Sequence, residues 1–284
     1  MEKHYRFAGV EITVYVPNDI AFDDEQSLAV FRAEQVTDPH RFEFELVDEL
    51  IPPEKCILTK QPGNNVYGDD YTQMRYIGSE ASPHIRAIHN GKMHYVQVKK
   101  GKYIQSISGR ILLNSFALEH LIVRNRGFIF HCSYIEHNGK AILFTAPSGT
   151  GKSTQAELWA EHRGAKIING DRAAVRLTDS IILAEGIPFA GSSKYCNNKN
   201  LPIQAIVYLG QASTTAIRKL RGYEAFSKIW EGISVNTWDK TDMEMVSDAV
   251  QIVAESIPIY HLTCTPDESA INALEEVLRK QEIL

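Results

Sequence analysis

Clustered cysteines and long apolar runs are both missing from this sequence. Its four cysteines, Cys56, Cys132, Cys196 and Cys264, are far apart and form no Cys-x-x-Cys pair, which excludes the common zinc-ligand spacings and favours reduced thiols. No stretch approaches the roughly 18 apolar residues of a membrane helix. The first residues also lack the apolar core and cleavage site of a signal peptide. We therefore expect a cytoplasmic protein with no membrane partner.

An excess of positive charge is lacking as well. The net charge is −5, and no stripe of alternating basic and aromatic residues is present. Nucleic-acid-binding proteins usually gather Lys and Arg on one face, so we expect no nucleic-acid partner. The contents of hydrophobic (44%) and charged (23%) residues are ordinary for a globular protein. A chain of 284 residues forms one large domain or two ordinary ones.

The spacing of apolar residues changes near residue 109. Before it, β-branched and alternating apolar residues over 8–16 and 42–46 predict strands, and Asn90-Gly91 predicts a type I′ hairpin. After it, apolar residues at helical spacing predict a helix that closes at 125–127. We predict an α/β fold with a β-rich N-terminal region over 1–108 and a second domain over 109–284.

The second domain alternates predicted strands and helices. A strand over 128–135 leads through the hairpin signal His137-Asn138-Gly139-Lys140 into a return strand over 141–145. A helix over 154–163 ends at Gly164, and the final helix is expected to begin at Thr265, with Thr265 as its N-cap. Further strands are predicted over 166–168, 173–177, 181–184 and 203–209, and the C-terminal region is predicted to be helical.

The strongest motif reads Ala146-Pro147-Ser148-Gly149-Thr150-Gly151-Lys152-Ser153-Thr154. It follows an apolar strand and opens a helix, which is the context of a Walker A phosphate loop, although Ala146 replaces the usual first glycine. The glycines let the backbone approach phosphate, and the helix N-terminus adds partial positive charge. Lys152 can reach the β- and γ-phosphates, and the Ser153 hydroxyl can bind Mg²⁺. We predict that a nucleoside triphosphate, ATP, binds through Ser148, Gly149, Thr150, Gly151, Lys152, Ser153 and Thr154.

An acidic residue follows the next predicted strand. Asp171 ends the run Lys166-Ile167-Ile168-Asn169-Gly170-Asp171, where a carboxylate can hold Mg²⁺ directly or through water. The alternative is a turn aspartate, since Asn169-Gly170 is typical of turns. Arg172 can pair with Asp171, contact a phosphate or lie in solvent. We predict a magnesium site formed by Ser153 and Asp171.

Other polar residues are candidates for the same site. His131 lies on the strand before the hairpin, where it can contact the acceptor hydroxyl or the γ-phosphate, or can be a packed core histidine. Lys194 and Lys199 follow a Gly- and Ser-rich loop, where they can line an entrance or lie in solvent.

Together these features resemble the HPr kinase/phosphorylase superfamily, including its HPr-kinase-like serine kinases, and more distantly ATP-dependent phosphoenolpyruvate carboxykinase. The resemblance rests on FHCSYIEHNGKAILFTAPSGTGKSTQAELW followed by INGDRAAVR, and extends over roughly residues 110–265. It implies a P-loop core of that type with C-terminal helices. It also implies catalytic roles for Lys152, Asp171 and His131, with ATP and Mg²⁺ as cofactors.

The sequence departs from the family pattern at two positions. Where the family has Asp-Asp-Arg, this chain has Gly170-Asp171-Arg172, so the metal aspartate is present and the catalytic acid is not. Thr154 replaces an acid that follows the loop serine in HPr kinases. Both departures weaken the bifunctional kinase/phosphorylase interpretation and leave nucleotide binding intact.

The leading hypothesis is a kinase that transfers the γ-phosphoryl group of ATP to a hydroxyl, expected to be a serine of a protein or peptide. A small-molecule kinase and an ATP-binding regulatory protein with reduced catalysis are the alternatives, and Gly170 favours the second of these. Residues 1–108 can recruit a substrate, form a homo-oligomer interface or simply cover the sheet. Family members are often oligomeric, which is an analogy only.

Overall fold

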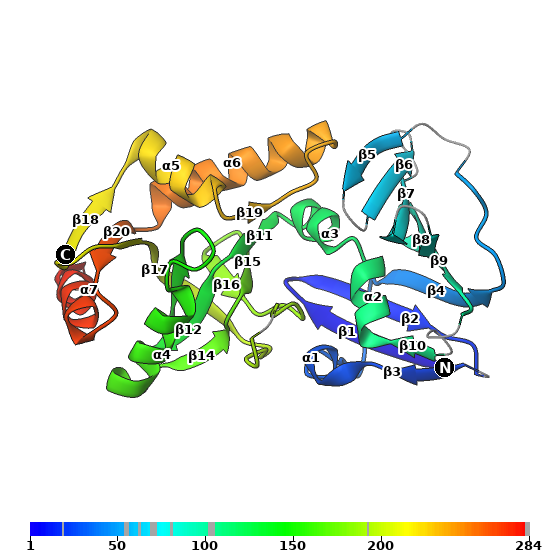
Figure 1. The fold of residues 1–284 in the computed structure, drawn as a ribbon, viewed down its shortest axis with the longest axis horizontal. Coiled ribbons are helices and arrows are strands. Elements are labelled where there is room, and N and C mark those ends of the chain that lie inside the picture. The colour runs from blue at the N-terminus through cyan, green and yellow to red at the C-terminus, as the bar shows by residue number, and fades with distance from the viewer. Residues whose placement is uncertain are drawn as a thin grey trace. The chain divides into compact units, whose positions relative to one another are not determined.

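The computed structural model describes residues 1–18, 20–53, 57–61, 64–68, 73–79, 82–101, 106–191 and 193–281. The chain divides into two compact units, Met1–Leu121 and Ile122–Leu284. Both units contain mixed β-sheet together with helices (Figure 1), so the predicted α/β class is confirmed. The division at residue 108 that the sequence suggests stays a prediction.

The first unit is built on a sheet with the strand order β1-β2-β4-β9-β8-β7-β6-β5 among the described residues. Strands β2, β4 and β9 run parallel to one another, and the remaining pairs are antiparallel. A short strand pair, β3 with β10, lies outside this sheet. The elements are β1 Glu2–Phe7, β2 Val10–Tyr15, β3 Ala21–Asp23, α1 Glu25–Ala29, β4 His40–Val47, β5 Ile57–Gln61, β6 Asn64–Gly68, β7 Gln73–Ser79, β8 Ser82–Asn90, β9 Met93–Lys99, β10 Ser106–Ser108 and α2 Gly109–Ser115.

Two sequence-based predictions need correction in this unit. The hairpin between β8 and β9 exists, but Asn90 pairs with Met93, so its two loop residues are Gly91 and Lys92, one position later than predicted. The helix predicted from residue 109 is divided into α2 and α3 (Leu118–Arg124). Ala117 takes a φ of 52°, which interrupts a helix even though the apolar spacing continues through it.

Three histidines form a hydrogen-bonded chain in the core of the first sheet. His94 on β9 lies 3.0 Å from His40 through one ring nitrogen and 3.0 Å from His89 through the other. The His94 ring also stacks on Phe42 with 4.1 Å between centroids, and only 1% of His94 is exposed. Burial lowers the pKa of His94 from 6.5 to about 3 and that of His40 from 6.5 to about 4. All three rings are therefore packed as neutral imidazoles.

The first unit should consequently lose stability in acid. A folded-state pKa below the ordinary value means that the unfolded chain binds more protons, so the free energy of unfolding falls as pH drops through 6.5. For His94 we expect a loss of about 3 kcal/mol between pH 6.5 and pH 4. Hydrogen exchange in β4, β8 and β9 measures this loss. The tryptophans, Trp159, Trp230 and Trp238, report on the second unit separately.

The matched variants are His94→Gln, which removes the titrating group, and His162→Gln, which removes an exposed histidine of the second unit. His94→Gln should make the dependence of exchange on pH less steep, since His40 and His89 still titrate, and His162→Gln should leave it unchanged. Equal dependence in all three proteins would show that the histidine chain does not control the acid stability of this unit.

The second unit has the strand order β14-β12-β13-β17-β16-β15-β11-β19 among the described residues, and β20 joins β17 to β18. Strands β13, β17 and β20 are parallel, and the other pairs are antiparallel. The elements are β11 Gly127–His131, β12 Ser133–His137, β13 Lys140–Thr145, α4 Lys152–Arg163, β14 Lys166–Asn169, β15 Arg172–Leu177, β16 Ile182–Glu185, β17 Asn200–Gln211, β18 Ala216–Leu220, α5 Gly222–Trp230, β19 Ile233–Ser234, α6 Lys240–Ser256, β20 Ile259–Cys264 and α7 Glu268–Gln281.

The single strand predicted over 128–135 is two strands. The chain changes pairing partner at Cys132: β11 pairs with β15 and β19, whereas β12 pairs with β13 and β14. A continuous apolar run cannot reveal this change, because both halves are buried. Strands β18 and β20 also interrupt the C-terminal region predicted to be helical. The last helix begins later than predicted, and Asp267 rather than Thr265 accepts a first-turn N–H, from Ser269 at 2.8 Å.

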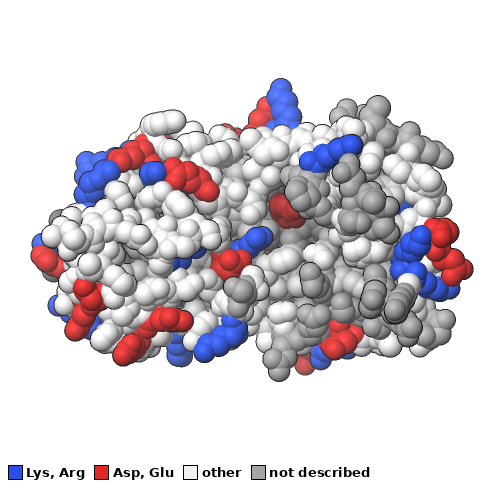
Figure 2. All heavy atoms as spheres, in the orientation of Figure 1, with Lys and Arg blue, Asp and Glu red and all other residues white. Residues whose placement is uncertain are grey.

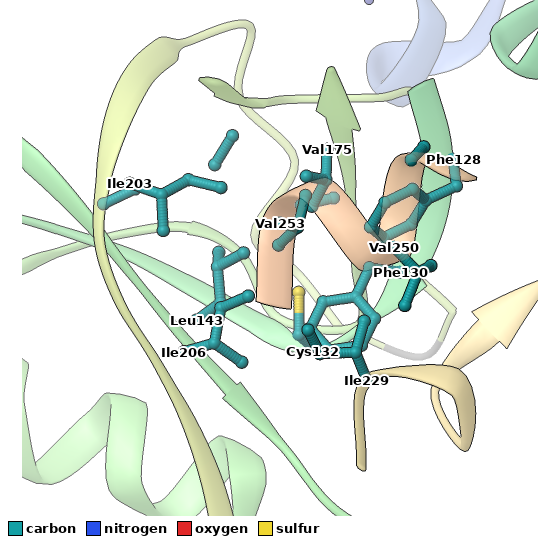
Figure 3. Packing of buried hydrophobic residues seen from close by; sticks show 14 of the residues in the cluster. Phe128, Phe130, Cys132, Leu143, Val175, Ile203, Ile206, Ile229, Val250 and Val253 are labelled. Carbon is teal, nitrogen blue, oxygen red and sulfur yellow. The ribbon is translucent and has the colours of Figure 1, made fainter. Parts of the chain in front are cut away.

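Two buried apolar clusters hold the second unit together. One packs β11, β13 and β17 against α5 and α6, and Figure 3 shows Phe128, Phe130, Leu143, Val250 and Val253 meeting there. The other packs the opposite side of β13 against α4 and α7 around the fully buried Trp159. The strand that precedes the 146–151 loop is therefore covered on both faces, which fixes the position of the loop.

The surface carries mixed charge. On the face that Figure 2 shows, Lys and Arg groups lie close to Asp and Glu groups. Ion pairs such as Arg163–Glu275 at 3.1 Å join the two signs. No helix among the described residues is long and apolar enough to cross a membrane.

Candidate functional site

The motif segment connects a buried strand to a helix. Strand β13 ends at Thr145, the loop occupies residues 146–151, and α4 begins at Lys152. The predicted hairpin leads into β13: His137 pairs with Lys140, and Asn138 and Gly139 have φ values of 50° and 73°. Positive φ at both loop residues is the requirement of a type I′ turn, which Asn-Gly satisfies. The predicted strand–loop–helix order is confirmed.

The loop presents the start of α4 without a capping side chain. Gly149 and Gly151 take φ values of 79° and 113°, which only glycine adopts readily, and Gly151 is the N-cap of α4. No acidic residue lies in the first turn of α4. The partial positive charge of the helix N-terminus is therefore not neutralised by the helix itself, an arrangement that can receive an anion.

Lys152 is held against the loop that precedes it. Its side chain is nearly buried, and its Nζ donates to the carbonyl oxygen of Ala146 at 3.0 Å and of Pro147 at 3.5 Å. Burial lowers the pKa of Lys152, while the nearby Asp171 carboxylate opposes that shift. Lys152 thus braces the loop through two hydrogen bonds, and its ammonium group lies beside the loop backbone.

A turn after β14 fixes the position of Asp171. Asn169 is fully buried, and its Oδ1 accepts the backbone N–H groups of Asp171 at 2.9 Å and Arg172 at 3.0 Å. Its Nδ2 donates to the carbonyl oxygens of Ile187 and Phe189. The Asn169-Gly170 turn therefore also sets the position of Asp171. A turn at this segment is compatible with a metal-binding role for Asp171.

Asp171 lies between His131 and Arg172. Its Oδ1 is 3.4 Å from His131 Nε2, and its Oδ2 accepts from Arg172 Nε at 3.1 Å. The end of β11 lies beside the start of the loop, where Thr145 Oγ1 donates to the His131 carbonyl oxygen at 3.0 Å. His131 is thus a partly exposed residue rather than a packed core histidine.

Burial and the positive charge of Lys152 lower the pKa of His131, and Asp171 partly opposes them. The neutral imidazole is therefore the favoured form near neutral pH, and it can accept a proton.

One cavity of about 560 Å³ brings most of the predicted site residues together. Its lining joins the end of β11, the loop, the first turns of α4 and the turn after β14. The predicted residues that line it are His131, Ser148, Gly149, Gly151, Lys152, Ser153, Thr154, Asp171 and Lys194. Thr150 does not line this cavity, and neither does Lys199, which lies 3.8 Å from Glu136.

The cavity also contains residues that the sequence analysis missed. Glu157 lines it because it follows Ser153 by four positions on α4 and so shares its face, a signal that the helix period could have revealed. Ser193 and Tyr195 come from the loop after β16, and no local pattern places them there. A Cβ added to Gly170 would collide with Ser193 Oγ and lie 2.7 Å from Ser193 Cβ. Gly170 is therefore required by this loop contact.

Two other cavities differ in their relation to the site. One of about 490 Å³ shares Gly149, Gly151 and Thr154 with the first. A larger one of about 750 Å³ lies between the end of β18, α5 and α6, and none of the predicted site residues lines it. The predicted site residues therefore lie outside this larger cavity.

Comparison with known proteins does not identify a family for this chain. No family model matches the sequence, and the search of curated proteins gave no match. Among solved structures, the Hpr(Ser) kinase/phosphatase from Coxiella burnetii is similar over 55% of this chain and 96% of that chain, at 9% identity and a TM-score of 0.33. This is a weak likeness that concerns the fold alone.

Proposed function

We propose that this chain binds ATP with Mg²⁺ at the 146–154 segment and transfers the γ-phosphoryl group to a hydroxyl, a serine of a protein or peptide. The observation that carries the proposal is one cavity that joins Lys152 and Ser153 of α4 with Asp171, after β14, and His131, at the end of β11. Phosphoryl transfer needs mainly positioning and charge stabilisation, and these residues supply both.

The donor set fits the implied metal and phosphates. Ser153 is exposed at the start of α4, and the Asp171 side chain is 25% exposed, so both can offer oxygen ligands in the cavity, the type that Mg²⁺ prefers. Mg²⁺, when bound, would neutralise phosphate charge. Lys152 and the first-turn N–H groups of α4 would hold the phosphate oxygens.

The acceptor side of the cavity contains a proton acceptor. In the proposed reaction the acceptor oxygen bonds to the γ-phosphorus, the bond to the β–γ bridging oxygen breaks, and ADP leaves. The hydroxyl proton passes to Nδ1 of neutral His131, while Nε2 keeps its proton toward Asp171 Oδ1 at 3.4 Å, and the Asp171 carboxylate stabilises the resulting positive charge.

A binding-only regulatory protein is the second candidate. The contact between Gly170 and Ser193 leaves no room for an acid at residue 170 without movement of the loop. That observation favours nucleotide binding with reduced transfer.

Purified chain with Mg-ATP and a serine-centred peptide library tests the proposal. We expect magnesium-dependent ATP binding by calorimetry and incorporation of phosphate into peptide by mass spectrometry. Binding without incorporation into peptides or free serine would support the second candidate. Absence of binding by the folded chain would overturn both.

A further inference from the structure

The second cavity beside the 146–151 loop is lined partly by apolar residues. Its volume is about 490 Å³, and it is lined by the loop, by the end of β17 and by the segment that follows β20. Leu209, Ala212 and Pro266 give it apolar surface. It shares Gly149, Gly151 and Thr154 with the first cavity, so a ligand held by the loop can extend from one cavity into the other.

Gln155 in this wall has an incompletely satisfied amide. Only 3% of the residue is exposed, and its Oε1 has no hydrogen-bond partner among the described residues. Its Nε2 donates to Cys264 Sγ at 3.5 Å, and a thiol sulfur is a weak acceptor. Buried side-chain amides normally have partners at both ends, so this amide can pair with a ligand that enters the cavity.

We propose that this cavity receives the adenine base of the nucleotide and that Gln155 recognises its edge. Adenine presents an amino donor beside a ring-nitrogen acceptor, and a glutamine amide offers the complementary acceptor and donor, as it does in bidentate glutamine–adenine pairs. Oε1 is itself buried, so recognition would require rotation of the terminal amide to turn both atoms toward the base. On its N7 edge, guanine presents a carbonyl acceptor where adenine has its amino group, and so leaves Oε1 without a donor.

The apolar surface of the cavity suits the faces of a purine. Leu209 is 2% exposed at the end of β17, and Cys264 beside Gln155 is buried, so little water competes for the amide. The proposal rests on the proposed function, because only a nucleotide held at the 146–154 segment would place its base here.

Calorimetry with three triphosphates tests the proposal: ATP, GTP and purine riboside triphosphate, which lacks the exocyclic amine. The wild type should bind ATP about tenfold more tightly than either of the others. Gln155→Met, which keeps the volume and removes both polar atoms, should lose most of this preference through weaker binding of ATP. Gln251→Met, at an exposed residue of α6 outside both cavities, should keep it.

Equal affinity of the wild type for all three triphosphates would overturn the assignment of Gln155 while leaving the proposed function intact. Retention of the preference in Gln155→Met, with an unchanged melting temperature, would overturn it too. Failure of the folded wild type to bind any triphosphate would instead overturn the proposed function, and this inference with it.

Discussion

Lys152→Ala should weaken binding of Mg-ATP about 100-fold, the usual scale for removal of one partner of a buried charged pair. Lys152 is 8% exposed and points its charge into the loop that would surround the phosphates. In the nucleotide complex its Nζ would exchange the Ala146 carbonyl oxygen for phosphate oxygens. Calorimetry of Mg-ATP against the variant measures the change in Kd.

The control for this variant is Lys166→Ala, which removes an exposed lysine at the start of β14 in the same unit. It should bind Mg-ATP as the wild type does. Lys152→Ala should also melt at a lower temperature, because the carbonyl oxygens of Ala146 and Pro147 lose their donor. A variant that loses the thermal stability but keeps the affinity would show that Lys152 only braces the loop.

Asp171→Asn should abolish most of the magnesium dependence of ATP binding and reduce transfer about 100-fold or more. The amide keeps the size of the side chain and removes the charge that a metal requires. The affinity for ATP measured in excess chelator should change little, so the ratio of affinities with and without Mg²⁺ is the decisive quantity. Asp179→Asn, at a 95% exposed carboxylate of the same unit, is the control.

A second readout for Asp171→Asn needs no ligand. Asp171 raises the pKa of His131 against the effects of burial and Lys152, so its neutralisation should lower that pKa further. Titration of the His131 ring by nuclear magnetic resonance measures this shift. An unchanged His131 pKa together with unchanged metal dependence would remove Asp171 from the site.

Local sequence patterns predicted the elements that surround the loop. Gly139, Gly151 and Gly164 each stand where the backbone takes a positive φ. Glycine adopts that conformation more readily than other residues, so its position in the sequence indicates the turn or helix end. The hairpin before β13 and the end of α4 at Gly164 are confirmed for this reason. The sequence placed His131 on the strand before the hairpin, and the structure brings it 3.4 Å from Asp171, a contact that was not predicted; the roles of both residues stay predictions.

Features that depend on distant segments could not be predicted in the same way. The change of pairing partner at Cys132 is decided by where β15 and β13 lie, and the run of apolar residues is the same on both sides. Gly170 is small because Ser193 packs against it from 23 positions further along the chain. The unsatisfied amide of Gln155 depends on Cys264, which no helical period relates to it.

The position of β20 has a consequence for how the second unit is made during synthesis. This strand lies between β17 and β18. It runs parallel to β17, which in turn runs parallel to β13. A ribosome therefore finishes the loop, Asp171 and His131 well before it delivers the strand that pairs with β17 and the Cys264 that Gln155 contacts. Until then β17 has a bare edge that other chains can pair with. The nascent protein is consequently exposed to edge-to-edge aggregation in the interval between synthesis of β17 and of β20.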